Sequence, residues 1–208
     1  MKLSSSHHAH ILLILIVFSA SVSADAQHMS MHTRQQNIFL LLMDTMMMKM
    51  DATVIGVSPE HDFIEQMIPH HVGAIEMAVY EIQHGKRFSM IQLAKSILAE
   101  QSGEVQQMKL YIKQLPSGKT EPRKGFKEDM DSTMEVMMKN MPDNTKLTDV
   151  DFAFASVMIP HHQAAIDMAK VVLKFSKDLQ TIAFAKQIIS TQEVEIEQMF
   201  SFLREIKS

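Results

Sequence analysis

The chain has 208 residues and a formal net charge of −4, and it contains 20 Met but no Cys or Trp. Gly and Pro number six each and aromatic residues make up 6%, a composition that favours long helices over a β-sandwich or a barrel. The absence of Cys excludes a disulfide framework and thiolate metal ligands, and the charge gives no indication of a nucleic-acid partner.

The N-terminal stretch has the pattern of a secretory signal peptide. Lys2 precedes an apolar run over residues 11–18, so we expect residues 1–26 to be removed after Ala24 or Ala26. An uncleaved anchor is the alternative, although the run is short for a membrane-spanning helix. The pattern predicts a periplasmic or secreted protein with no stable membrane insertion after cleavage. The mature chain then opens with a tail that either captures metal or is idle, through His28, Met29, Met31 and His32.

The rest of the chain is a duplication. A shift of 91 residues aligns residues 67–71 with residues 158–162, and both stretches read MIPHH. The same register aligns a Met-rich segment upstream and a Gln/Glu segment downstream, so each unit has three parts. We divide the chain into a tail and first helix (27–57), a first repeat core (58–115), a linker with the second Met-rich helix (116–148) and a second repeat core (149–208).

All three parts of a unit have helical spacing. Ser58 and Pro59 predict the start of the second helix, and Gly85 predicts its end. Six helices with short connections predict an all-α bundle of two three-helix units, either merged or separate. The Met-rich segments place their sulfurs at i, i+3, i+4 and i+7 on one helix face, at Met43, Met46, Met47 and Met50 and at Met134, Met137, Met138 and Met141.

The residues with metal-binding chemistry lie in the second helix of each unit. Met67, His70 and Met77 share one stripe with Ala74, so we expect this stripe to face the core, with His71 on its flank. A buried imidazole needs a hydrogen bond or a metal at each ring nitrogen. The second unit repeats the set as Met158, His161, His162 and Met168.

Pro69 and Pro160 precede these histidines in what otherwise has the pattern of one continuous helix. An internal proline removes a hydrogen bond and kinks the helix, which would open room for a ligand. The alternative is that a new helix begins at each proline.

The third helix of each unit carries polar groups on a core-facing stripe. Unsatisfied polar groups there cost roughly 1–3 kcal/mol each, so we expect the His pair to satisfy Gln101 and Glu104. Glu104 would orient an imidazole or bind the metal directly. The complete set is Gln101, Glu104 and Met108 in the first unit and Gln192, Glu195 and Met199 in the second.

Thioether and imidazole groups together suit Cu(I), and silver(I) fits the same thioethers. Zinc normally uses Cys, His and carboxylate ligands, and neither unit has the Glu-x-x-His spacing of a di-iron bundle. A stripe of Met is more often core packing than a ligand set, because Met fills irregular gaps. The Met-rich first helices are therefore candidates either for packing or for accessory metal binding.

The stretches MIPHHVGAIEMA and MIPHHQAAIDMA resemble the family known as domain of unknown function 305. That family is grouped with ferritin-like proteins and includes CopM-type periplasmic copper-binding proteins. The resemblance covers roughly residues 58–115 and 149–206, and it implies a helical bundle that binds metal through the Met and His residues of these stretches. The chain departs from the usual Gln, Gly and Trp of the family at Val72, at Ala164 and at Tyr111 and Phe202.

Together these features predict a copper-binding protein that favours Cu(I), accepts silver(I), has no organic cofactor and is not an enzyme. It would buffer copper, confer resistance or pass metal to a copper-exporting or metal-accepting protein. Two alternatives stay open: a metal-dependent oxidase on the same scaffold, and a bundle whose Met-rich face binds partners without metal.

Overall fold

The computed structural model describes residues 36–116 and 123–206. The expected signal peptide and the tail residues His28, Met29, Met31 and His32 lie outside these ranges. Within them the chain forms six α-helices and no strand, which confirms the all-α bundle, and none of the helices is long and apolar enough to cross a membrane. The helices are α1 (Ile38–Asp51), α2 (Pro59–His84), α3 (Phe88–Tyr111), α4 (Phe126–Lys139), α5 (Val150–Phe175) and α6 (Leu179–Glu205), with a 3-10 turn, η2 (Asn144–Lys146), before α5.

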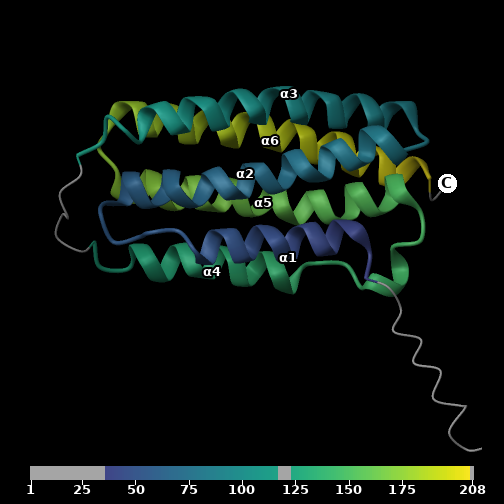
Figure 1. Cartoon of the computed structure of the whole chain (residues 1–208), viewed down its shortest axis with the longest axis horizontal. Helices are drawn as coiled ribbons and strands as arrows, with labels where there is room; N and C mark the ends of the chain where they lie inside the picture. The colour runs from purple at the N-terminus through teal and green to yellow at the C-terminus, as the bar shows by residue number, and fades with distance from the viewer. Residues whose placement is uncertain (1–35, 117–122, 207–208) are drawn as a thin grey trace, which may run out of the picture. The chain divides into compact units, whose positions relative to one another are not determined.

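The central pair of the bundle is α2 and α5. Figure 1 shows them side by side in the middle layer, with α3 and α6 on one side and α1 and α4 on the other. α2 packs against α1, α3 and α5, and α5 packs against α2, α4 and α6. Because α2 and α5 come from different repeats and pack together, the described helices share one hydrophobic core and form a single merged bundle.

Local sequence signals set the helix ends. The Ser58 hydroxyl accepts a hydrogen bond from the amide of His61 (3.2 Å), and Pro59 is the first residue of α2, as predicted. Gly85 ends α2, also as predicted, but its backbone is extended (φ −62°) rather than left-handed. A Cβ atom at Gly85 would lie 2.6 Å from the carbonyl oxygen of Glu81, so only glycine fits this close approach.

Pro69 and Pro160 are buried inside α2 and α5, and both helices continue through them. The alternative that a new helix begins at each proline is therefore wrong. Since proline has no N–H, neither ring can donate to the carbonyl one turn earlier, and the helices tolerate this because their apolar faces are buried in the core.

The two repeats differ in how closely their Met-rich helices approach the central pair. A Cβ atom at Gly73 would lie 2.8 Å from Cγ of Met46, so α1 rests on α2 at a distance that only glycine allows. The second repeat has Ala164 at the equivalent position. Its methyl group is buried on α5, so α4 cannot pack there in the same way.

Candidate metal centre

The two His-His motifs meet at the contact between α2 and α5. The rings of His70 and His161 stack with their centroids 3.9 Å apart and their planes tilted by 34°. These two side chains are fully buried, as are those of His71 and His162. The first histidine of one motif therefore stacks on the first histidine of the other motif. With His71 and His162 beside them, the four imidazoles form one cluster between α2 and α5.

One contact fixes the tautomer of His161. Its Nε2 lies 3.1 Å from the backbone oxygen of His70, and a carbonyl can only accept, so Nε2 carries the proton and donates it. In the neutral ring Nδ1 then has a free lone pair. Nδ1 of His161 has no hydrogen-bond partner, and neither nitrogen of His70 has one. Buried, unpartnered ring nitrogens of this kind are what a coordinated metal ion would satisfy.

The second histidine of each motif pairs with a glutamate from the third helix of its unit. Nε2 of His71 lies 2.9 Å from Oε2 of Glu104, and Nε2 of His162 lies 2.8 Å from Oε2 of Glu195. Because a carboxylate accepts, each Nε2 donates, and each Nδ1 is left without a partner. A carboxylate behind an imidazole is the usual arrangement around metal-binding histidines, since it fixes the ring and makes its free nitrogen more basic.

The electrostatic surroundings favour neutral imidazoles at His70 and His161. Burial lowers the pKa of His70 well below its ordinary value of 6.5, and the neighbouring His71 and His162 lower it further. Burial also lowers the pKa of His161, and the other three histidines add to this effect more strongly than the bond to the His70 carbonyl opposes it. A metal ion binds only the neutral form, so no proton has to be displaced from an imidazolium at His70 or His161 at neutral pH.

The predicted thioether residues of the two motifs lie in the same core. Met67 and Met77 of α2 and Met158 and Met168 of α5 are fully buried, which confirms that their stripes face inward. In the described part of the chain, no three His, Asp or Glu side chains are grouped so that they could hold one metal ion. A site built on these histidines must therefore use other ligands as well, and thioethers are the soft ones available in the core.

The glutamines behave differently from the prediction. Gln101 and Gln192 are buried, as expected, but their amide atoms have no hydrogen-bond partner. The expectation that the histidines satisfy them is therefore wrong, and on each third helix only the glutamate forms a hydrogen bond with an imidazole. Met108 and Met199 are also buried, and Met108 lines a cavity between α3 and α6.

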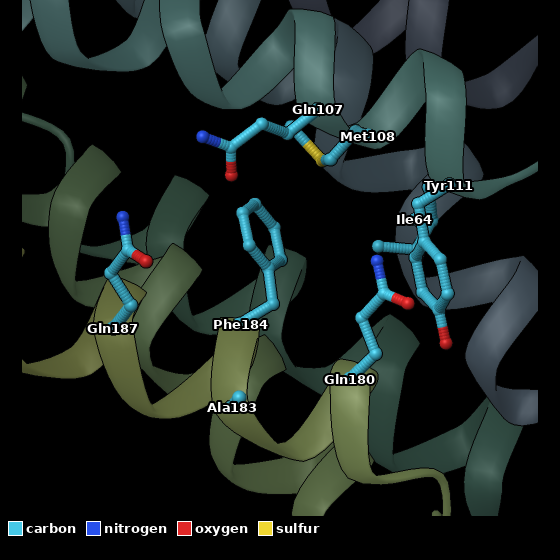
Figure 2. Close-up of a pocket in the computed structure, with 8 residues that line it drawn as sticks. All are labelled: Ile64, Gln107, Met108, Tyr111, Gln180, Ala183, Phe184 and Gln187. Atoms are coloured by element: carbon cyan, nitrogen blue, oxygen red, sulfur yellow. The ribbon is translucent and has the colours of Figure 1, made fainter.

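That cavity has a volume of about 170 Å³ and is lined by residues of both repeats. Figure 2 shows Gln107 and Met108 of α3 above Phe184 and Gln187 of α6. Nε2 of Gln187 donates to Oε1 of Glu104 over 3.2 Å, so this carboxylate is held from both repeats. Sequence reasoning missed Gln187, because its equivalent in the first repeat is Ser96 and the duplication gives no signal there.

The Met-rich helices mostly contribute to the core. Met43, Met46 and Met50 of α1 and Met137 of α4 are buried, whereas Met138 is 41% exposed. Sequence reasoning also missed Met130 of α4, which is buried. Its spacing of four and seven residues from Met134 and Met137 would have placed it on their stripe. The half-buried members of the predicted set are Met47, Met134 and Met141.

Comparison with known proteins places the chain in a family. The sequence profile described as domain of unknown function (DUF305) matches residues 15–112 and again residues 111–203. The chain belongs to the DUF305 family. The double match agrees with the duplication, and the family suspected from the two MIPHH stretches is confirmed. No curated protein matches the sequence significantly.

Several solved structures share the fold. CopM in its Cu(I)-bound form is 26% identical, with 72% of this chain and 98% of CopM covered and a TM-score of 0.55. CopM in an Ag-bound form obtained by soaking is 28% identical over 70% of this chain and 95% of CopM, with a TM-score of 0.54. A DUF305 fragment from Deinococcus radiodurans, 22% identical over 72% of this chain and 99% of the fragment with a TM-score of 0.52, shares the fold. CopM was also solved in a Cu(II)-bound form.

Proposed function

We propose that this protein binds Cu(I), and Ag(I) in its place, at the histidine cluster between α2 and α5. The observation that carries the proposal is the set of buried ring nitrogens without partners on His70, His71, His161 and His162, two of them backed by glutamates. Buried polar atoms without partners are costly, and a metal ion would remove that cost. The Cu(I)-bound and Ag-bound forms of CopM support the same choice of ion.

The thioethers of the motifs complete the proposed ligand set. Met67 and Met77 flank His70 on α2, and Met158 and Met168 flank His161 on α5. Thioether sulfur and neutral imidazole suit Cu(I) better than Cu(II), which supports Cu(I) as the preferred oxidation state. No thiolate competes for the ion, because the chain has no Cys.

The proposed role is to buffer copper, to protect against it or to pass it to an exporting or accepting protein. Full burial of the histidines favours slow exchange of a bound metal ion with solvent. Slow exchange suits a protein that holds metal better than one that catalyses a reaction, so we propose that the chain is not an enzyme. The signal-like residues 1–26 support a periplasmic or secreted location.

Anaerobic titration with Cu(I) against a competing chelator tests the proposal. The wild type should bind tighter than micromolar, and X-ray absorption should detect both nitrogen and sulfur ligands. A variant with His70→Gln and His161→Gln should lose the metal-dependent rise in thermal stability, which for a ligand at 100 times its Kd is about 2.7 kcal/mol. The matched control is His84→Gln, because His84 is exposed and stacks on Tyr80 away from the cluster. Full binding by a folded variant that lacks all four core histidines would refute the proposal.

A further inference from the structure

The histidine cluster is fully buried, so an ion that binds there has to cross an outer layer of the bundle. One such layer is formed by α3 and α6, which Figure 1 shows next to each other above the central pair. α3 packs extensively on α2 and α6 packs extensively on α5, whereas α3 and α6 contact each other much less. The seam between α3 and α6 is therefore the loosest part of this layer.

The duplication places one pair of residues on its two-fold axis in this seam. A residue that contacts its own copy under a two-fold exchange lies on the axis, as His70 and His161 do in the central layer. Glu100 of α3 and Thr191 of α6 are also equivalent under the shift of 91 residues, and they face each other across the seam. Glu100 therefore lies over the middle of the histidine cluster.

Two more carboxylates flank Glu100. Glu104 lies one turn away on α3, Glu195 is its equivalent on α6, and each is bonded to an imidazole of the cluster. Burial raises the pKa of Glu100 above its ordinary value, and the negative charges of Glu195 and Glu104 raise it further, so the three groups lie close enough to interact. In the part of the chain that the structure describes, no Lys or Arg forms an ion pair with any of the three. The seam is therefore negative without a fixed counter-charge.

These carboxylates lie at different depths. Glu100 is half-buried and reaches solvent, whereas Glu104 and Glu195 are buried. Both oxygens of Glu104 already have hydrogen-bond partners, but Oε1 of Glu195 has none. An ion that passes Glu100 therefore meets a free carboxylate oxygen at Glu195, the residue that holds the imidazole of His162.

Two buried amides beside the axis are consistent with the passage of a polar species. Gln101 and Gln192 directly follow Glu100 and Thr191 in the sequence. Both are almost completely buried, and neither atom of either amide has a hydrogen-bond partner. Such amides destabilise a closed apolar core, whereas their oxygens can accept a cation or a water molecule that moves between Glu100 and the histidines.

We propose that Cu(I) or Ag(I) enters the histidine cluster between α3 and α6, with Glu100 as the carboxylate that draws the ion in and Glu195 as the one that receives it. The route rests on the proposed function, since it leads to that site. Glu100 acts on the ion in passage and is not one of its final ligands. A negative group at the mouth of a cleft raises the association rate of a cation, and the ligands that hold the ion at equilibrium stay the same.

The rate of silver uptake by the full chain tests the route. Apo protein is mixed with silver nitrate, and after a variable delay a coloured chelator reports the silver that has not been taken up. The histidine-dependent part is the uptake that is missing from a variant with all four core histidines replaced by Gln. Glu100→Thr copies the second repeat's residue at the equivalent position. At low ionic strength it should slow the histidine-dependent uptake by about 3- to 10-fold and leave the affinity at equilibrium unchanged.

The salt dependence and two controls separate a charge effect from damage to the fold. High concentrations of sodium perchlorate should remove the difference from the wild type, because salt screens the charge of Glu100. Glu197→Thr removes the same charge at an exposed position of α6 and should not change the rate. Thr191→Lys keeps all three carboxylates but puts a cation opposite Glu100, so it should slow uptake at least as much. Its control is Ser190→Lys, at the exposed neighbouring position.

The results that overturn the route differ from those that overturn the proposed function. Histidine-dependent uptake that is as fast in folded Glu100→Thr or folded Thr191→Lys as in the wild type would overturn the route and leave the function intact. Slower uptake that persists at high salt, or an equally large loss of affinity, would also overturn the route, because the substitution would then act on the binding site itself. A wild type without any histidine-dependent uptake would overturn the proposed function, and the route with it.

Discussion

Glu81 is the group whose replacement should change stability most clearly. Its carboxyl group is fully buried near the C-terminal end of α2, next to the buried carboxyl group of Asp151 on α5. Asp151 accepts hydrogen bonds from the backbone amides of Lys86 and Arg87. Burial raises the pKa of Glu81 from 4.5 to about 8, and the neighbouring negative charge of Asp151 adds to the rise.

The direction of the pH effect follows from where the proton is bound. Between about pH 4.5 and 8 the folded chain keeps the proton on Glu81 while the unfolded chain has lost it, so the free energy of unfolding falls as pH rises. The fall is about 2.5 kcal/mol from pH 5 to pH 7 and about 1.4 kcal/mol more from pH 7 to pH 9. Below about pH 4.5 the contribution is fully present, and above about pH 9 it is lost.

Glu81→Gln imitates the protonated group, since its amide is uncharged at every pH and has nearly the same shape. Urea unfolding at pH 5, 7 and 9 measures the effect, and the difference between variant and wild type cancels the titration of other groups. We expect the variant to gain on the wild type by about 4 kcal/mol between pH 5 and pH 9, with Glu197→Gln, at an exposed position of α6, as a control without this trend. A constant difference between variant and wild type from pH 5 to pH 9 would refute the assignment of a buried proton to Glu81.

Three further predictions concern packing, metal affinity and a helix start. Gly73→Ala should lower the free energy of unfolding by about 1–3 kcal/mol in urea, because its methyl would overlap a side chain of α1, whereas Ala164→Gly at the equivalent position should not produce an overlap. Glu104→Gln and Glu195→Gln should each weaken Cu(I) binding by about 10- to 100-fold in a chelator competition, and unchanged affinity in both would contradict their role behind the imidazoles. Asn37→Ala should cost about 1 kcal/mol in thermal unfolding, because the Asn37 side chain caps α1, and a loss below a few tenths would contradict this.

The sequence was sufficient for the helices because their signals are local. Ser58 and Pro59 start α2 through a cap and a fixed backbone angle, and neither depends on the rest of the fold. The partner of His71 could also be predicted, since a buried carboxylate such as Glu104 needs a donor. The same argument failed for Gln101, because helical spacing gives the face of a residue but not its level against a neighbouring helix.

Contacts between the repeats could not be predicted in this way. The stacking of His70 on His161 depends on how α2 docks on α5, and the duplication alone is compatible with two separate bundles. The bond from Gln187 to Glu104 depends on how α6 packs against α3, and Met130 has no methionine counterpart to draw attention to it. Helical periodicity shows which face of one helix a residue lies on, whereas these contacts are made between two helices.

Identical motifs do not make the two halves of the histidine cluster equal. Glu104 has His71 on one oxygen and Gln187 on the other, whereas Oε1 of Glu195 has no partner. The first imidazole is therefore held by a carboxylate that cannot turn without breaking a second bond, and His162 is backed by one that can. Since the orientation of a ligand ring depends on the group behind it, Glu104→Gln should weaken Cu(I) binding more than Glu195→Gln does. Gln187→Ser, which copies the first repeat's residue at this position, should bring the effects of these two substitutions together in a chelator competition, and effects that are already equal without it would contradict this reasoning.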